Sequence, residues 1–318
     1  MKKLRAGIVG ATGYTGTELA RWLVSHPYID LQRVYSTRKA GSTLASCIPS
    51  LLGYYDLILE EPTTENFTDI DVLFLATPHG AAESLAKRAQ NVPKIVDLSR
   101  DHRHKEGWIY AQPEWKHRQL PNATRISAPG CFATAISLAL APLVADRALI
   151  GDVQVSAATG STGSGASPKA TTHHPDRFTN LKAYKVLHHQ HIPEILNFLN
   201  TIGEPPTIHF VPLSAPVDRG IFATVFVQLK EYFDLSSCFT QYYEKKSLIR
   251  IRDNTPELRF VRGSAFADIS THQQGNSGVV LIAIDNLGKG AASQALQATN
   301  LSYGYPETTG LISSPLHL

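Results

Sequence analysis

The chain has 318 residues, of which 43% are hydrophobic, and this length suffices for two domains of ordinary size, each with its own core. Its 30 basic and 27 acidic side chains nearly balance, so the formal net charge is only +3, and the sequence has no long run of one sign. We therefore expect a small-molecule partner and neither a nucleic acid nor a membrane surface.

The cysteines and the N-terminus indicate where the protein works. Cys47, Cys131 and Cys238 are few and scattered, and none forms a C-x-x-C pair, so we expect reduced thiols. The apolar run near the N-terminus is too short for a secretory signal, and no window approaches the roughly 20 apolar residues of a membrane helix. We expect a cytoplasmic protein.

Residues 1–150 alternate between short apolar runs and helical patterns. The runs are "AGIVG", "LQRVYST", "DVLFLATP" and "KIVDLS", and the helical stretches are "TELARWLVSHP" and "AAESLAKRAQ". Such alternation predicts an α/β fold with a Rossmann-type, doubly wound parallel sheet.

Residues 151–286 have a different texture. Segments rich in β-forming residues, "VQVSAATG", "TIHFVPLS", "FATVFVQLK" and "GVVLIAID", are separated by long connections with helical stretches near "IPEILNFLN" and "SSCFTQYYEKK". They predict a second, α+β domain. A last helix, at about residues 287–303, is expected to join the first domain.

Glycines at every third position, from Gly7 to Gly16, lie between the first strand and the first helix. Glycine lets such a turn bend sharply and brings backbone N–H groups close to a pyrophosphate, which the positive end of the helix also favours. A purely structural loop is the alternative. We predict a dinucleotide contact along this turn, at Gly10, Thr12, Gly13, Tyr14, Thr15 and Gly16.

The end of the second expected strand bears on the choice of dinucleotide. NAD-specific sites usually place an acidic residue about 20 positions after the glycine turn, where it bonds the ribose 2′-hydroxyl. Here "YSTRKAG" supplies Ser36 and Arg38 instead. A hydroxyl and a cation suit a 2′-phosphate, so we predict NADP(H), against the alternative that these are solvated loop charges.

Cys131 follows Pro129-Gly130 and begins an apolar stretch with helical potential. At a helix N-terminus the positive end of the dipole favours the thiolate, although a lone cysteine is more often a small buried hydrophobe. A base is available from a dense histidine group: His173, His174, His188, His189 and His191. These histidines also allow a metal site, but no cysteine or carboxylate stands at a familiar ligand spacing, and we expect none.

Seven segments in order resemble a known family. They are "GATGYTG", "ATPHG", "DLSRDHR", "APGCFATA", "HHQHIPEI", "DRGIFAT" and "AIDNLGKGAASQA", and they span almost the whole chain. The sequence is similar to the N-acetyl-γ-glutamyl-phosphate reductases, within the wider semialdehyde dehydrogenase group.

The resemblance implies an NADPH-dependent enzyme of arginine biosynthesis that reduces an acyl phosphate to an aldehyde. Cys131 matches the family's catalytic cysteine, which forms a thioester, and His189 matches its acid/base histidine. The resemblance implies substrate contacts at Arg103, His191 and Arg219. It also implies further cofactor contacts at Pro78, Ser99, Asn286 and Gly288. The second domain would then serve catalysis and oligomerisation, and the chain would form a homo-oligomer, dimer or tetramer.

The sequence departs from the usual family pattern at four places. Ala128 stands where the family often has Asn, and Gln190 stands between two histidines where Arg is usual. The segment "SPKATTHHPDR" and the ending "GYPETTGL" resemble a branch that reduces aminoadipyl or glutamyl phosphate on a small amino-group carrier protein, in lysine or arginine biosynthesis. The carrier-linked substrate is therefore an alternative.

Two further alternatives stay open at the level of sequence. A glyceraldehyde-phosphate or aspartate-semialdehyde dehydrogenase would share the glycine turn, the cysteine and the histidine. A non-catalytic NADP-binding regulator could also be built on the same fold, because a fold does not by itself establish chemistry.

Overall fold

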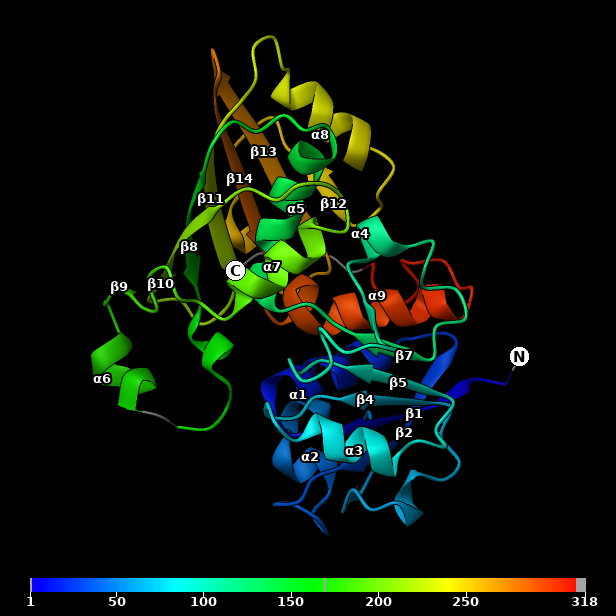
Figure 1. The fold of residues 1–318 in the computed structure, drawn as a ribbon. Helices are drawn as coiled ribbons and strands as arrows, with labels where there is room; N and C mark the ends of the chain where they lie inside the picture. Colours follow the sequence, from blue (N-terminus) through cyan, green and yellow to red (C-terminus); the bar gives the residue numbers. More distant parts are fainter. Residues whose placement is uncertain (1, 169, 313–318) are drawn as a thin grey trace. The chain divides into compact units, whose positions relative to one another are not determined.

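The computed structural model describes residues 2–168 and 170–312, and the chain forms two compact units (Figure 1). The first unit runs to Gly130 and takes in Ala291–Ile312, and the second is Cys131–Gly290. No helix in the described ranges is both long and apolar enough to span a bilayer.

The first unit is built on a seven-stranded sheet in which every described strand pair is parallel. In spatial order its strands are β3 (Leu59–Glu60), β2 (Ile29–Tyr35), β1 (Leu4–Val9), β4 (Val72–Leu75), β5 (Lys94–Asp97), β7 (Arg125–Ser127) and β6 (Ile109–Tyr110). Its helices are α1 (Tyr14–Leu23), α2 (Leu44–Cys47), α3 (Ala82–Arg88), α4 (Pro113–Lys116) and α9 (Ser293–Ser302). The predicted Rossmann-type sheet is confirmed.

Continuous apolar runs explain the central strands of this sheet. All residues of β4 and β5 are buried, as expected for strands of a parallel sheet that helices cover on both faces. Helix α1 buries Leu19, Trp22 and Leu23, the side chains that recur at helical spacing.

The C-terminal helix α9 belongs to the first unit. Helix α9 contacts α1 and α4, and Asn300 Oδ1 lies 3.0 Å from the Nε2 atom of the buried His26. At the end of α9, the carbonyl of Ser302 accepts a hydrogen bond of 3.4 Å from the buried Lys94 ammonium.

The second unit is a mixed seven-stranded sheet with helices packed on one face (Figure 1). In spatial order its strands are β12 (Ile249–Ile251), β13 (Ala267–Gln274), β14 (Ser277–Ile284), β11 (Ile221–Gln228), β8 (Val153–Thr159), β10 (Ile208–Ser214) and β9 (Lys182–Ala183). Its helices are α5 (Cys131–Ala145), α6 (His174–Arg177), α7 (His191–Leu199) and α8 (Leu235–Tyr243). This is the predicted α+β arrangement.

The second unit starts at Cys131, earlier than the boundary near residue 150 that the texture of the sequence predicts. The difference is helix α5, which contacts β11, β14 and α7 and is apolar on all sides. A helix of that kind must be buried in a core, and the core that it fills is the one under the second sheet.

The other face of the second sheet is only partly covered. Strands β8, β10, β11 and β14 alternate between buried residues that face the helices and residues with partial exposure. Phe222, Phe226, Val279 and Leu281 lie on this open face, and Phe226 is 47% exposed. Partly exposed aromatic and aliphatic side chains on one sheet face are typical of surfaces at which proteins associate.

Candidate active site

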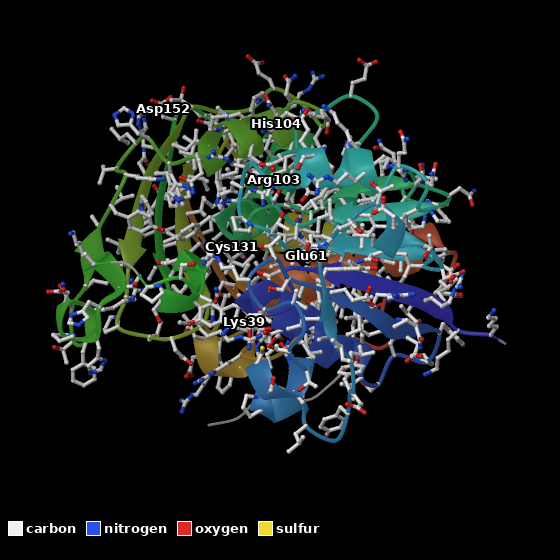
Figure 2. The ribbon with its side chains drawn as sticks, turned by 90° about the horizontal axis from the view of Figure 1, so that it is seen from below. Lys39, Glu61, Arg103, His104, Cys131 and Asp152 are labelled. Atoms are coloured by element: carbon white, nitrogen blue, oxygen red, sulfur yellow. The ribbon has the colours of Figure 1, made fainter. Side chains whose placement is uncertain are left out.

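Cys131 is the first residue of α5 and is partly exposed (Figure 2). Every residue from Phe132 to Val144 is buried, so the helix that carries the thiol is held on all sides by the core of the second unit. The thiol therefore stands on a rigid element, at the end where the helix dipole favours a negative charge.

His189 lies beside the first turn of α5. Its ring packs edge-on against Phe132, with 5.4 Å between centroids, and against Phe210 at 5.3 Å. The side chain of His191 is close to it, with ring centroids 4.7 Å apart, and only 3% of His189 is exposed. The structure thus brings the predicted histidine pair next to the residue that follows Cys131.

Burial lowers the pKa of His189 to about 4, and the nearby Lys185 cation contributes in the same direction. The ring is therefore neutral at pH 7. The backbone N–H of His191 donates to His189 Nδ1 at 3.2 Å, so Nδ1 is an acceptor and the neutral ring carries its proton on Nε2. His189 can offer an N–H donor without carrying a positive charge.

Arg219 lies at the turn before β11, and its guanidinium is fixed from inside the second unit. Its Nε donates to the buried carboxylate of Asp285, at 2.8 Å from Oδ1 and 2.6 Å from Oδ2. The backbone is fixed as well, because a Cβ on Gly160 would lie 2.5 Å from the amide nitrogen of Arg219. Only a glycine at 160 allows this approach, so the backbone and the guanidinium of Arg219 are both held within the second unit.

Asn286 and Gly288, predicted as cofactor contacts, shape the backbone of the second unit. The Asn286 Oδ1 accepts from the Gly220 N–H at 2.7 Å, and its Nδ2 donates to Thr162 Oγ1 at 3.0 Å. Gly288 is packed so closely that a Cβ would lie 2.3 Å from the carbonyl oxygen of Ser264. Both residues hold the turn after β14, and their contact with a cofactor stays a prediction.

Two residues near the thiol were not anticipated. Tyr184 packs its ring against His189 at 5.8 Å, and burial raises the pKa of its phenol, with a smaller contribution from the charge of Cys131. Asp285 is the carboxylate that holds Arg219. Its signal in the sequence is an acid directly after the apolar run "VVLIAI", where a carboxylate must be buried and paired.

In the first unit, the glycine turn has the shape that the spacing predicts. Gly10 has a φ of +84°, and a Cβ there would lie 2.4 Å from the carbonyl oxygen of Ala76. A Cβ on Gly16 would lie 2.2 Å from the carbonyl oxygen of Gly10, so the start of α1 is packed directly on the turn. Thr12, Gly13 and Thr15 are partly exposed along this turn and Tyr14 is exposed. Only glycine fits at positions 10 and 16, and a dinucleotide phosphate can approach the backbone of this turn.

The loop after β2 carries the residues predicted to select the dinucleotide. Ser36 is buried and its Oγ accepts from the Lys39 N–H at 3.3 Å, which closes the loop. The side chains of Arg38 and Lys39 are exposed, and Lys39 is labelled in Figure 2. Two cations therefore stand free to meet a phosphate at the carboxyl end of β2.

The loops after β4 and β5 are tied together in the same unit. The Asp101 carboxylate accepts from the N–H groups of Gly80 at 2.8 Å and Ala82 at 3.0 Å, while Pro78 is exposed beside them. The Ser99 hydroxyl is buried and donates to Asp97 Oδ2 at 3.0 Å, so this side chain shapes its own loop. Its predicted contact with a cofactor is untested.

Arg103 is buried in the first unit, where its Nε donates to the Ala128 carbonyl oxygen at 3.0 Å. Ala128 belongs to the segment that leads to Cys131. The contact fixes the backbone of that segment, and the role of Arg103 toward a substrate stays a prediction.

The histidine group divides into two sets. His189 and His191 are buried, whereas His173, His174 and His188 are exposed. Across residues 2–168 and 170–312, no three His, Cys, Asp or Glu side chains are grouped so as to hold a metal ion.

Comparisons with known proteins agree with this architecture. Residues 5–123 match the family model described as the semialdehyde dehydrogenase NAD binding domain, and residues 131–286 match that of the semialdehyde dehydrogenase dimerisation domain. Aspartate-semialdehyde dehydrogenase II from Vibrio cholerae superposes with a TM-score of 0.76 at 16% identity, over 94% of this chain and 98% of that one. The Candida albicans aspartate-semialdehyde dehydrogenase solved with NADP gives a TM-score of 0.67 at 16% identity, over 94% and 100%.

The fold and the two matched domains define an NAD(P)-binding oxidoreductase of the semialdehyde dehydrogenase class. Closer relatives narrow the assignment. An N-acetyl-gamma-glutamyl-phosphate reductase from Azobacteroides pseudotrichonymphae is 37% identical over 97% of this chain and 98% of its own length. The reductase of the same name from Bacteroides thetaiotaomicron is 38% identical over 98% and 99%. The chain belongs to the N-acetyl-gamma-glutamyl-phosphate reductase family.

Proposed function

We propose that this chain reduces N-acetyl-γ-glutamyl phosphate to N-acetylglutamate 5-semialdehyde and phosphate, with NADPH as reductant, in arginine biosynthesis. The observation that carries the proposal is the thiol of Cys131 at the start of the buried helix α5, beside His189, in a chain 37% identical to reductases of that name. The same identity favours the free acyl phosphate over the carrier-linked aminoadipyl phosphate and over a non-catalytic regulator.

The dinucleotide would lie on the glycine turn of the first unit. The backbone cradle at Gly10 and Gly16, which a Cβ would fill, fits a pyrophosphate. Arg38 and Lys39 would bind the 2′-phosphate, which favours NADPH over NADH. When bound, the cofactor supplies the hydride for the reduction.

Cys131 would act as the nucleophile. Its thiolate attacks the acyl carbon of the substrate, the bond from that carbon to the phosphate oxygen breaks, and phosphate leaves, so that a thioester joins the substrate to Sγ. When the thioester carbon is reduced, the carbon–sulfur bond breaks and the thiolate is restored as the aldehyde departs. Because Cys131 is the first residue of the buried helix α5, its Sγ would keep one position through both steps.

His189 and Arg219 would serve these steps differently. A neutral His189 carries its proton on Nε2 and can donate a hydrogen bond to the oxygen on which charge develops, or give that proton away. Arg219, oriented by Asp285, would bind a carboxylate or phosphate of the substrate, and Arg103 and His191 would support it.

The test is run in the oxidative direction, where N-acetylglutamate semialdehyde, phosphate and NADP⁺ should yield NADPH, seen by its absorbance. Cys131→Ser should lose at least about a thousandfold in kcat because the thiolate nucleophile is gone. Cys47→Ser is the matched control, since Cys47 has the same partial exposure and lies in the other unit. An unchanged rate in Cys131→Ser, or a strong preference for the carrier-linked aminoadipate semialdehyde, would overturn the proposal.

We also infer that the chain assembles as a homodimer through the open face of the second sheet. The matched dimerisation-domain model spans this unit, and Phe222, Phe226, Val279 and Leu281 supply an apolar surface there. Phe226→Lys should produce monomers in light scattering after size-exclusion chromatography. A variant that still elutes as the wild-type oligomer would place the interface elsewhere.

A further inference from the structure

Asp285 lies at the point where β14 ends, and none of it is exposed. Both of its carboxylate oxygens are engaged. Besides Arg219 Nε, they accept backbone N–H groups at three places: Leu287 at 2.8 Å, Gly288 at 2.9 Å and Gly263 at 2.5 Å. A buried carboxylate with this many donors is held in one position.

The first consequence concerns the orientation of Arg219. Asp285 accepts at Nε, the edge of the guanidinium nearest the chain, so the edge formed by the two terminal nitrogens faces away from this carboxylate. Asn286, the residue after Asp285, fixes the backbone next to Arg219, because its Oδ1 accepts from the N–H of Gly220 at 2.7 Å. Asp285 thus holds the guanidinium of Arg219, and Asn286 holds the backbone that follows it.

The second consequence concerns the thiol. The turn that Asp285 organises continues to Gly290, whose N–H donates to the Asp285 carbonyl oxygen at 2.8 Å. A Cβ on Gly290 would lie 2.9 Å from the Cβ of Cys131, so the backbone of this turn is packed directly against the nucleophile. Asp285 therefore contacts Arg219 through its side chain and also stabilises the turn that packs against Cys131.

We propose that Asp285 is a positioning residue that sets Arg219 and the Gly288–Gly290 turn in a fixed geometry relative to Cys131. The proposal rests on the proposed function for the assignment of Arg219 as the anion-binding group. In its absence the guanidinium would lose its fixed orientation, and the substrate's anionic group would no longer be held at one distance from Sγ.

The experiment compares Asp285→Asn, Arg219→Gln and the double variant, by kcat/KM with N-acetylglutamate semialdehyde, phosphate and NADP⁺. Asp285→Asn keeps the shape of the side chain and the backbone carbonyl that accepts from Gly290, but it loses the charge and one of the two side-chain acceptor oxygens. We expect it to lose about 10- to 100-fold in kcat/KM, most of it through Arg219. The double variant should therefore lie within about threefold of Arg219→Gln alone, and the remaining factor is the part that acts through the turn beside Cys131. Losses that multiply in the double variant would show that Asp285 does not act through Arg219, and would overturn the proposal.

Asp268→Asn is the matched control. Asp268 is also wholly buried in the second unit and accepts from an arginine Nε, that of Arg250, at 2.5 Å. It controls for the loss of a buried carboxylate, so its thermal destabilisation should be similar while its effect on kcat/KM multiplies with that of Arg219→Gln. If Asp285→Asn does not fold, Asp285→Glu replaces it. The longer side chain of the glutamate displaces the Arg219 guanidinium. The resulting loss of kcat/KM should likewise shrink to within about threefold in the Arg219→Gln background.

A second measurement separates this proposal from the proposed function. Iodoacetamide alkylates Cys131 without any substrate, and mass spectrometry follows the modified peptide. Asp285→Asn should change the alkylation rate at least about threefold because the turn against Cys131 moves, whereas Asp268→Asn should not. If the wild type fails to turn over the semialdehyde, the proposed function fails while this measurement still tests Asp285. An unchanged alkylation rate refutes the bracing of Cys131.

Discussion

Gly290 provides a direct test of how tightly Cys131, the proposed nucleophile, is held. The Cβ of Gly290→Ala would lie 2.9 Å from the Cβ of Cys131 and 3.2 Å from the carbonyl oxygen of Asp285, whereas ordinary contacts begin at 3.4 Å. The Cys131 side must therefore give by 3.4 − 2.9 = 0.5 Å, or the turn must move by the same amount. Neither is flexible, because α5 is buried along its length and the turn is bonded to Asp285.

Two magnitudes follow from that displacement. Overpacking of this kind costs about 1–3 kcal/mol, which lowers the Tm by several degrees in a unit of this size. Active-site groups must keep their positions to about 0.5 Å, and a 1 Å error can cost roughly 100-fold, so kcat should fall about tenfold. Thermal melts and the NADPH-forming assay measure the two effects separately.

Gly163→Ala is the control for this prediction. A Cβ on Gly163 meets only Thr159 Oγ1, at the ordinary distance of 3.4 Å, so neither stability nor kcat should change appreciably. If Gly290→Ala keeps the wild-type kcat and alkylation rate within twofold, the turn is not what constrains Cys131, and the reasoning from the contact fails.

Three further predictions concern charge and pH. Arg38→Ala should lower kcat/KM for NADPH about 10- to 100-fold, because a charge-assisted bond to phosphate is worth about 1.5–3 kcal/mol, while kcat/KM for NADH stays unchanged as the internal control. Burial lowers the pKa of His26 below its ordinary value of 6.5, so between that value and the lowered pKa the unfolded chain binds more protons than the folded chain. The free energy of unfolding should therefore fall as the pH drops through this range, and it should fall less in His26→Gln. Because the pKa of His189 is about 4, the kcat/KM profile should show no fall from its protonation between about pH 5.5 and 7, and a limb near pH 6.5 that disappears in His189→Asn would contradict its burial.

Periodicity in the sequence predicted most of the elements that carry the site. The runs assigned to β8, β10, β11 and β14 are strands within a residue or two of the expected bounds, because alternating burial marks strands that are covered on one face. Strand β13 was not anticipated. Its second half, "THQQ", is polar and exposed, and its pairing with β14 is a long-range fact that local pattern does not contain.

The site was predictable only in part, for a physical reason. Local patterns predicted Cys131, a thiol before an apolar helix, and the paired histidines that include His189, whereas the family resemblance implied Arg219. The state of each group depends on residues far away in the sequence. Phe210 helps to bury the ring of His189, and Asp285, 66 positions after Arg219, orients its guanidinium. Spacing within a motif does not encode such contacts.

Glycines determine much of the backbone packing in the second unit, because they allow segments of backbone to approach closely rather than because they are flexible. Gly160 lets one loop close on Arg219, and Gly288 and Gly290 let the turn after β14 close on Ser264 and Cys131. At each position a single methyl group would displace backbone or Cys131 itself, so the geometry around Cys131 and Arg219 is set where side chains are absent. If Cys131 and Arg219 act as proposed, neighbours that do no chemistry orient them, and we expect Asp285 and these three glycines to affect turnover as much as a residue that touches the substrate.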